Sequence, residues 1–409
     1  MDKKPEKLVP EVRFKGFTDD WEQRKLGEIS KRVRNNDGRM NLPLLTISAR
    51  YGWMTQQSRF SASIAGREKK NYTLLEKHQL SYNHGNSKVA IYGTVYELTN
   101  YDEALVPKVY HSFSLTPENS SKFIESYFHT KKLDAQLRKF IASTARMDGL
   151  LNISFDDFMK VKLFAPEQCE QSKISRIINL IEKLITLQQR KLEQFKQLKK
   201  ALLQQLFVDK NNKQPNLRFK NFNGDWEQHK LDEMLQERNE QITVNDKYPL
   251  MSFVQGAGVV PKSQRYNREF LVKSSNKKYK KTELGDFIYS SNNLETGSIG
   301  FNKTGKAVIS SVYSIFKSRN NRESQFIGIL SKQKKFINKM LRYRQGVVYG
   351  QWKIHESDFL NLRILAPNIQ EQEKIIDLFS KIDTLITLQQ NKLTQLTTLK
   401  KYLLQKLFI

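Results

Sequence analysis

Residues 165–207 read APEQCEQSKISRIINLIEKLITLQQRKLEQFKQLKKALLQQLF, and residues 366–408 read APNIQEQEKIIDLFSKIDTLITLQQNKLTQLTTLKKYLLQKLF. The two stretches align without a gap at an offset of 201, and 24 of their 43 positions are identical. An internal repeat constrains the architecture more strongly than any single element does. The chain is therefore built from two copies of one unit, and each copy ends in this segment.

A second matched pair stands at the start of each copy. Residues 10–28 read PEVRFKGFTDDWEQRKLGE and residues 215–233 read PNLRFKNFNGDWEQHKLDE, with 12 of 19 positions identical at an offset of 205. Between the matched ends, residues 29–148 and 234–349 share little. Two unlike middles inside matched frames indicate one task performed on two different targets.

Each exit segment is expected to form one long helix. Its apolar residues recur in steps of four and three, which is the spacing of a coiled-coil seam. Pro166 and Pro367 stand where a helix can begin, and Glu170 and Glu371 in the early turns suit the helix dipole. At 1.5 Å per residue such a helix would be about 60 Å long. The residues expected to pair the two helices are Ile174, Ile178, Ile181, Ile185, Gln188, Leu192 and Phe195, and Ile375, Phe379, Ile382, Ile386, Gln389, Leu393 and Leu396.

The seam is interrupted by Gln188 and Gln389, at the same place in both copies. Two interpretations stay open. Buried glutamines would fix the register of the pair at some cost in stability, or the helices rotate slightly and leave both side chains in water. The linker at 208–225 is polar and turn-rich. The economical path for the second helix is then back toward the first domain, which predicts an antiparallel pair.

The divergent regions have a mixed pattern. Strand-like runs at 88–92, 95–98 and 307–316 alternate with a helical stretch at 122–140, and turn signals are frequent. The expected fold class is α+β: two α/β domains separated by two long helices that pair as an antiparallel coiled coil, with a pseudo-two-fold internal repeat. The expected segments are 1–162 and 226–363 for the two domains, 163–207 and 364–409 for the helices, and 208–225 for the linker. Weak anchors at an offset of 207 are Tyr72 with Tyr279 and Tyr82 with Tyr289.

The net charge of +27 comes from 69 Lys and Arg against 42 Asp and Glu. The two divergent domains carry 19 of these 27 charges, +8 in residues 21–162 and +11 in residues 226–363. Such a surplus repels itself unless an anionic partner is present. No apolar run approaches the roughly 18–20 residues of a membrane span, and no apolar stretch typical of a signal peptide follows the N-terminus. Nucleic acid is the expected partner.

The single cysteine, Cys169, cannot form an internal disulfide, and with six histidines in the chain a zinc site is not expected. We expect a reducing, cytoplasmic location and no bound metal.

Basic, amide and aromatic side chains are interleaved in the divergent domains. Such side chains can read base edges and grip phosphates. Each one singly could be an ordinary solvated residue, and the stretch around the shared glycines Gly149 and Gly350 could be a DNA-facing loop or a plain turn. As a set they favour DNA contact. The candidates are Ser48, Arg50, Tyr51, Trp53, Arg67, Lys69, Lys70, Tyr72, Asn83, Asn86 and Arg146 in the first domain, and Lys277, Lys278, Lys280, Lys281, Asn292, Asn293, Arg342, Arg344, Tyr349, Gln351 and Lys353 in the second.

Catalytic motifs are missing from the sequence. It contains no GxxxxGK[ST] or GxGxxG, and no Pro-Pro of the kind that grips a flipped base. Asp156 and Asp157 stand at an expected helix start, where capping explains them. The isolated His84 is more typical of a loop residue than of a general base. We expect no catalytic site in this chain.

The matched frames resemble those of type I restriction–modification specificity subunits. The resemblance spans nearly the whole chain in its layout of target-recognition domain, helix, target-recognition domain and helix. The divergent domains match only in general character, so no target sequence is carried over. The residues that carry the resemblance are Arg13-Phe14 with the run 21–26, Ala165-Pro166 with Glu170-Gln171 and the run 185–189, and the copies Arg218-Phe219 with 226–231 and Ala366-Pro367 with Glu371-Gln372 and 386–390.

The resemblance implies a DNA sequence-specificity subunit that binds a bipartite site, one half-site per domain, with the helices as a ruler. Its implied partners are double-stranded DNA, two adenine-methyltransferase subunits and two motor-nuclease subunits. S-adenosylmethionine, ATP and Mg²⁺ would be bound by those subunits and not by this chain. The alternatives are a stand-alone sequence-specific DNA-binding regulator and a coiled-coil scaffold, and the scaffold leaves the 19 excess charges unexplained.

Overall fold

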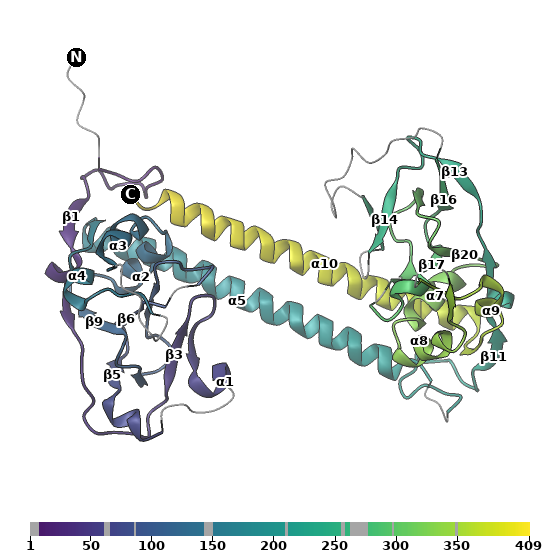
Figure 1. Ribbon diagram of the computed structural model, residues 1–409, viewed down its shortest axis with the longest axis horizontal. Coiled ribbons are helices and arrows are strands. Elements are labelled where there is room, and N and C mark those ends of the chain that lie inside the picture. The colour runs from purple at the N-terminus through teal and green to yellow at the C-terminus, as the bar shows by residue number, and fades with distance from the viewer. Residues whose placement is uncertain are drawn as a thin grey trace, which may run out of the picture. The chain divides into compact units, whose positions relative to one another are not determined.

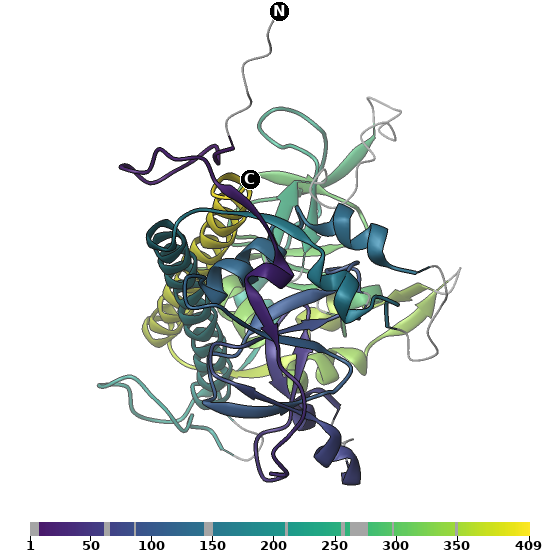
Figure 2. The ribbon, with the colours of Figure 1, turned by 90° about the vertical axis from the view of Figure 1, so that its left-hand side faces the viewer.

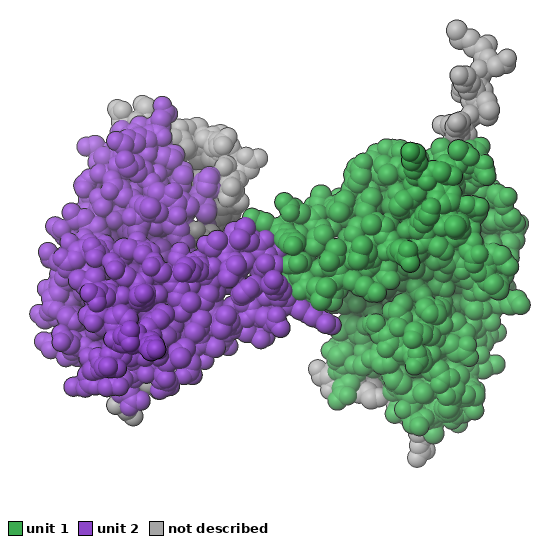
Figure 3. Space-filling model, turned by 180° about the vertical axis from the view of Figure 1, so that it is seen from behind, with its two compact units in different colours: residues 1–189, 391–409 green, residues 190–390 purple. Residues whose placement is uncertain are grey.

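The computed structural model describes residues 8–60, 66–85, 87–142, 150–208, 212–254, 258–261, 277–296, 298–347 and 351–409. The chain divides into two compact units, one of residues 1–189 with 391–409 and one of residues 190–390 (Figure 3). Each unit therefore contains one divergent region together with a part of each long helix. No helix among the described residues combines the length and the apolar character that crossing a membrane requires.

The two long helices are α5 (Gln168–Gln205) and α10 (Ile369–Lys406), each of 38 residues. They lie side by side (Figures 1 and 2). Their directions are opposite, because Glu182 pairs with Lys400 in the first unit and Asp383 pairs with Lys199 in the second. The expected antiparallel coiled coil is confirmed. Each helix begins two residues after its proline, whose carbonyl oxygen accepts a hydrogen bond from a glutamine one turn into the helix.

The first unit is built around a four-stranded antiparallel sheet in the order β2-β9-β6-β7. These strands are β2 (Ser30–Arg32), β9 (His111–Leu115), β6 (Leu80–Asn83) and β7 (Thr94–Glu97). Three smaller pairs join β1 (Glu22–Lys25) to β10 (Lys162–Ala165), β3 (Leu45–Ser48) to β4 (Gly52–Thr55), and β5 (Thr73–Glu76) to β8 (Glu103–Val106). The helices are α1 (Gln56–Phe60), α2 (Ser121–His129), α3 (Asp134–Phe140) and α4 (Phe155–Met159), with the 3-10 turns η1 (Leu26–Glu28) and η2 (Gly66–Asn71).

The second unit has a four-stranded antiparallel sheet in the order β12-β20-β17-β18. These strands are β12 (Leu235–Glu237), β20 (Ser314–Ser318), β17 (Phe287–Tyr289) and β18 (Ile299–Phe301). A three-stranded sheet contains β13 (Gln241–Thr243), β16 (Lys278–Thr282) and β19 (Ala307–Ile309). The remaining pairs are β11 (Glu227–Lys230) with β23 (Arg363–Ala366), β14 (Met251–Val254) with β15 (Gly258–Pro261), and β21 (Gln345–Val347) with β22 (Gln351–Lys353). The helices are α6 (Leu231–Met234), α7 (Glu323–Leu330), α8 (Lys334–Leu341) and α9 (Glu356–Leu360), with the 3-10 turn η5 (Ser291–Asn293).

The central sheets of the two units are counterparts, although their sequences share little. In each sheet the strands follow the same spatial order relative to their order along the chain. The paired tyrosines Tyr82 on β6 and Tyr289 on β17 are fully buried. Their rings lie 4.3 Å and 5.0 Å from those of Phe158 and Phe359, between ring centroids. The weak tyrosine match is therefore a match of core positions.

The core of each unit includes the C-terminal end of the long helix from the other copy. In the first unit Phe408 lies against Trp21, with 6.4 Å between ring centroids. In the second unit Phe207 lies against Trp226 at 6.0 Å. Both tryptophans are almost completely buried. The tryptophan of each entry segment thus packs against the C-terminal end of the exit segment of the other copy.

A buried ion pair ties each entry segment to the start of the helix in its own copy. The Arg13 guanidinium donates to both carboxylate oxygens of Glu170, each at 2.8 Å. Arg218 donates to Glu371 in the same way, at 2.9 and 2.8 Å. Both carboxylates are buried. Glu170 and Glu371, in the first turns of the long helices, thus each form an ion pair with an arginine in addition to interacting with the helix dipole.

Three elements expected from local pattern differ in the structure. Residues 88–92 form no strand and lie in the connection between β6 and β7. The run 307–316 contains two strands, β19 and the start of β20, separated by a turn in which Tyr313 N donates to Ser310 O. The stretch 122–140 is two helices, α2 and α3, with Lys131 at φ +66° between them. Alternating apolar residues did not reveal these breaks, because strand pairing is decided by partners far along the chain.

Candidate nucleic-acid interface

The tip of the β3–β4 hairpin presents a cation and an aromatic ring to solvent. The Ser48 Oγ accepts from the backbone N–H groups of Arg50 and Tyr51, at 3.4 and 3.3 Å, and closes the turn. Gly52 has φ +70°, and a Cβ there would lie 3.1 Å from the Tyr96 ring, so glycine is required. Arg50 is exposed and Tyr51 is 68% exposed. These two residues remain the strongest candidates for DNA contact in the first unit.

Two other predicted contact residues, Trp53 and Asn83, form hydrogen bonds that fix the base of this hairpin. The Trp53 indole N–H donates to Glu97 O at 3.0 Å, and the Asn83 amide donates to Ile47 O at 3.0 Å. The Asn83 carbonyl oxygen accepts from Gly85 N. Their direct contact with DNA stays a prediction, and their polar groups are already bonded inside the domain. Trp53 and Asn83 stabilise the tip of the hairpin through these hydrogen bonds.

The other candidates in the first unit lie in or near η2. Lys70 is exposed and Lys69 partly exposed. The Tyr72 hydroxyl accepts from the Gln56 amide at 2.9 Å, so it serves the packing of the hairpin end. The side chain of Arg67 and the residues Asn86 and Arg146 lie outside the described residues.

In the second unit the structure brings several candidates together around the β21–β22 hairpin. The Arg344 guanidinium pairs with Glu295 at 2.8 Å and stacks 4.6 Å above the Trp352 ring. The Asn292 carbonyl oxygen accepts from Trp352 N at 2.6 Å. Gln351 and Trp352 are exposed, as is the neighbouring Lys353. Trp352 was missed among the candidates, although an aromatic residue between a glutamine and a lysine was the available signal.

The lysines of β16 divide into two groups. Lys277, just before the strand, and Lys278 are exposed. Lys280 is only 7% exposed, with its ammonium 4.0 Å from a carboxylate oxygen of Glu356. Lys281 pairs with Glu240 at 2.8 Å. Both lysines lie on β16, the central strand of its sheet, and are already paired with carboxylates, so their DNA contact stays a prediction and Lys280, being buried, is the weaker candidate.

Three candidates of the second unit remain to be placed. Arg342 and Asn293 are exposed. Tyr349 lies outside the described residues.

The residues proposed to pair the helices lie on the buried or partly buried face of α5 and α10. Ile174 and Ile178 join the core of the first unit, where Leu407 and Phe408, which follow α10, also lie. Ile375 and Phe379 do the same in the second unit. Their packing involves the divergent domain as well as the partner helix, so the seam is wider than a simple helix pair. The members farther along the helices are Ile181, Leu192 and Ile382, which are buried, and Ile185, Gln188, Phe195, Ile386, Gln389, Leu393 and Leu396, which are partly exposed.

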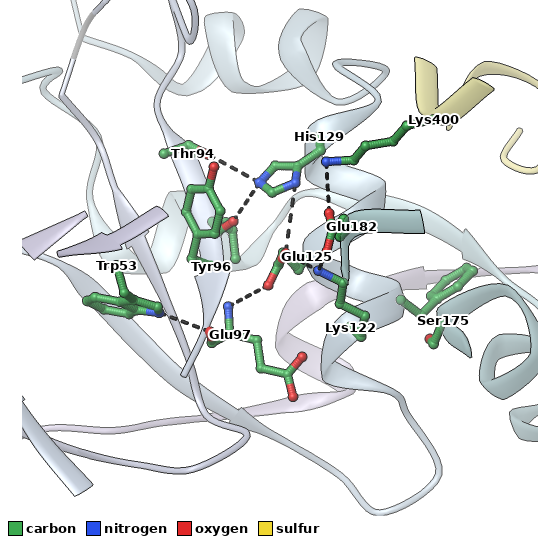
Figure 4. A network of polar contacts seen from close by, with 12 residues as sticks. Trp53, Thr94, Tyr96, Glu97, Lys122, Glu125, His129, Ser175, Glu182 and Lys400 are labelled. Carbon is green, nitrogen blue, oxygen red and sulfur yellow. Dashed lines mark hydrogen bonds and ion pairs between the residues drawn. The ribbon is translucent and has the colours of Figure 1, made fainter. Parts of the chain in front are cut away.

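One cluster among the described residues, Glu125, His129 and Glu182, has carboxylates and an imidazole close enough to hold a metal ion. The Lys122 ammonium lies 2.6 Å from Glu125 and 2.5 Å from Glu182, and Lys400 lies 2.8 Å from Glu182 (Figure 4). A charged side chain thus occupies the position that a cation would need. Burial lowers the pKa of His129. The cluster is an ion-pair network that joins α2 to the long helices.

Two hollows lie at the matched frames, one in each unit. They measure about 530 and 920 Å³. Each is lined by matched entry and exit residues, among them Arg13, Asp20 and Glu22 in the first. Carboxylates outnumber basic groups in both linings. An acidic wall repels phosphate, so these hollows are not part of the candidate DNA interface.

Comparison with known proteins gives one family and several structures. Residues 223–398 match the family described as "Type I restriction modification DNA specificity domain". The S subunit of a type I restriction–modification system from M. genitalium is 13% identical, with a TM-score of 0.62 over 98% of this chain and 99% of that chain. The HsdS subunit from Thermoanaerobacter tengcongensis is 14% identical, with a TM-score of 0.43 over 99% and 98% of the two chains. No curated protein matches the chain by sequence.

The described residues form two α+β units and an antiparallel helix pair, with exposed basic and aromatic side chains on short hairpins. Residues 223–398 are thus similar to a type I restriction–modification DNA specificity domain, and the chain as a whole has the fold of a solved S subunit.

Proposed function

We propose that this chain binds a bipartite DNA site, one half-site per unit, and directs partner subunits to it. The observation that carries the proposal is that two unlike domains share one sheet order inside matched frames. The matched entry and exit segments would let both copies bind the same kind of partner subunit. The unlike surfaces of the divergent domains would let them bind two different DNA sequences. The helix pair then serves as the ruler that sets the unread gap.

Direct reading is assigned to exposed residues of two short hairpins. Arg50 with Tyr51 in the first unit, and Gln351 with Lys353 in the second, are exposed on short hairpins whose bases are bonded to the sheet or its neighbours. Arginine and glutamine can bond base edges in two places at once in the major groove. Lys70 and Lys278 are proposed to contact phosphates, which adds affinity without sequence choice.

Docking of two methyltransferase subunits is assigned to the long helices. Each helix exposes leucines on the same outward stripe, at Leu184 and Leu187 of α5 and at Leu385 and Leu388 of α10. These positions correspond in the repeat, and the stripe continues at Leu198 and Leu399. An exposed apolar row is characteristic of a surface that another protein covers. Two identical stripes fit two copies of one partner.

The chemistry is proposed to reside in the partner subunits. S-adenosylmethionine would serve the methyltransferase subunits in methylating adenine, and ATP with Mg²⁺ would serve two motor-nuclease subunits. What supports this assignment is the absence from the sequence of a phosphate-binding loop and of a Pro-Pro motif that grips a flipped base.

Methylome sequencing of a host that expresses the full chain with its methyltransferase subunit tests the proposal. The expected result is adenine methylation at one motif of two defined halves with a gap of constant length. The control host expresses the methyltransferase subunit alone and shows no such motif. A continuous motif would overturn the bipartite reading, and tight specific binding by the purified chain alone would favour a stand-alone regulator.

A further inference from the structure

A carboxylate at the same repeat position of each long helix contacts the divergent domain. Glu182 on α5 and Asp383 on α10 correspond at the offset of 201. Each pairs with a lysine of the opposite helix, Lys400 and Lys199, and these also correspond. The repeat has therefore kept one ion pair between the helices in both units. In each unit the same carboxylate also receives a second lysine, from the divergent domain.

In the first unit this second lysine begins a chain of polar contacts that ends at the β3–β4 hairpin (Figure 4). Lys122 lies 2.5 Å from Glu182 and 2.6 Å from Glu125. The other carboxylate oxygen of Glu125 accepts from Glu97 N at 2.9 Å. The Glu97 carbonyl oxygen accepts from the Trp53 indole on β4 at 3.0 Å. Four consecutive contacts thus link the long helix to the base of the exposed tip.

The neighbouring residue on β7 supports the tip from a second side. The Tyr96 hydroxyl donates to Ala49 O at 3.3 Å, and its ring lies under Gly52. Burial raises the pKa of Tyr96 to about 12, which keeps the hydroxyl protonated as a donor. The hairpin is therefore held at both ends of its turn by β7, whose position α2 fixes through Glu125.

In the second unit a shorter chain of contacts links Asp383 on α10 to the β14–β15 hairpin. The second lysine on Asp383 is Lys303, at 2.5 Å, in the connection after β18. The next residue, Thr304, donates its hydroxyl to Val259 O on β15 at 2.7 Å. A Cβ on Gly258, with φ +84°, would lie 3.4 Å from Lys303 N. The β14–β15 hairpin is thus packed on the residue that reaches the helix carboxylate.

The two links reach matching carboxylates through lysines that do not match. Lys122 is on α2 and Lys303 follows a strand, so neither belongs to the repeated frame. Surface ion pairs formed by chance would not be expected at the same helix position in two unlike domains. Glu125 is 4% exposed, and a polar network with such a buried member specifies one geometry because any rearrangement leaves a charge unpaired.

We propose that Glu182, and its counterpart Asp383, are positioning residues for DNA recognition. Each sets the hairpin linked to it relative to the long helices. Because the hairpin linked to Glu182 carries the β3–β4 tip, sequence reading at the first half-site depends on a carboxylate that does not touch DNA. The inference rests on the proposed function, because it needs the β3–β4 tip to contact the half-site.

The test uses the full chain with its methyltransferase subunit in a host whose methylome is sequenced. Glu182→Gln removes the charge that holds Lys122 and keeps the volume of the side chain. We expect discrimination at the first half-site to fall about tenfold, the effect of one lost base contact, with the second half-site and the gap unchanged. Asp383→Asn, whose link ends at the β14–β15 hairpin and not at the β21–β22 hairpin assigned to reading, is expected to leave the first half-site unchanged. The control Glu193→Gln, an exposed carboxylate on α5, leaves both half-sites unchanged.

Two further variants separate positioning from stability and from the function itself. Ile178→Val, in the buried core beside the network, lowers the unfolding temperature but keeps the motif. Arg50→Ala tests the tip directly. If Arg50→Ala relaxes the first half-site and Glu182→Gln does not, the positioning role is wrong although the proposed function stands. If Ile178→Val relaxes the motif as much as Glu182→Gln at equal stability loss, general destabilisation explains the effect and the inference fails. If Arg50→Ala changes nothing, the proposed interface itself is wrong.

Discussion

Lys332, at the end of α7 in the second unit, has an unusual electrostatic environment. Burial, together with the positive charges of Lys199 and Lys303, lowers its pKa to about 7 from the ordinary 10.5. Asp383 is the carboxylate that offsets this repulsion. The ammonium is therefore near half-charged at neutral pH, and its charging costs stability.

The sign of this cost gives a pH-dependent prediction. Between pH 7 and 10.5 the unfolded chain binds a proton at this side chain that the folded chain does not, so stability rises with pH across that window. Below pH 7 the cost is fully present. Lys332→Met is expected to raise the free energy of unfolding more at pH 6 than at pH 9, measured by chemical denaturation. Lys334→Met, at an exposed neighbour, is the control, and an equal gain at both pH values would contradict the prediction.

The buried arginine of each entry segment gives a second prediction at the residue scale. Arg13→Met leaves the Glu170 carboxylate, which is 0% exposed, without its bidentate partner. Breaking such a pair is expected to cost about 3 kcal/mol of unfolding free energy. The control Arg24→Met breaks the exposed pair with Glu22 and is expected to cost under about 1 kcal/mol. Similar losses in both variants, in a thermal or urea unfolding experiment, would show that Arg13 does not anchor the helix start.

At the scale of the element, each long helix carries at the same repeat position a side-chain oxygen that is buried and unbonded among the described residues. The side-chain carbonyl oxygens of Gln188 and Gln389 are buried and accept no hydrogen bond from the described residues. This favours the interpretation in which a polar group inside the seam fixes register. Thr186 and Thr387, nearby, instead bond back to the carbonyls one turn earlier, as hydroxyls on exposed helix faces do.

Removing the orphaned oxygen is expected to stabilise the pair. Gln188→Leu should raise the unfolding free energy by about 1 kcal/mol, because a buried acceptor without a donor costs that much or more. Gln189→Leu, at the exposed neighbouring position, is the control and should give no gain. Urea denaturation of the full chain measures both. A destabilised Gln188→Leu variant would indicate that the glutamine is bonded in solution.

At the scale of the whole molecule, the ruler proposal concerns helix length. Inserting four residues, about one helical turn, into one long helix is expected to lengthen the unread gap and keep both half-sites. Methylome sequencing of a host that carries the variant with the methyltransferase subunit measures both quantities. Altered half-sites with an unchanged gap would reject the helices as the ruler.

The independence of the two domains gives a second prediction at this scale. Exchange of residues 234–349 for those of another family member is expected to change one half-site and leave the other and the gap intact. The reason is that the exchanged segment holds the second central sheet, the β14–β15 hairpin and β21, the strand that pairs with Gln351–Lys353, but almost none of the matched frame. A change in both half-sites would mean that the units do not read DNA separately.

Much of the architecture could be inferred from the repeat. The long helices followed from apolar spacing and from the matched segments, their opposed directions from the linker that returns the second helix toward the first domain, and the α+β character from the mixed pattern of the divergent regions. The candidate site was less accessible. Arg50 and Tyr51 are exposed as expected, but Trp53, Asn83, Lys280 and Lys281 are bonded inside their domains. Residue type cannot separate these cases, because an amide or ammonium serves a backbone carbonyl or an internal carboxylate as readily as a base.

By itself, the sequence determined that this protein is a doubled unit with two unlike basic domains and two long helices, because repeats and periodic apolar faces are local properties of the chain. Only the tertiary structure decided that the two divergent regions share a sheet, that each core takes in the other copy's helix end, and that Glu182 and Asp383 reach the hairpins. Those features depend on contacts between residues far apart in sequence, and a local sequence pattern does not predict which residues will meet.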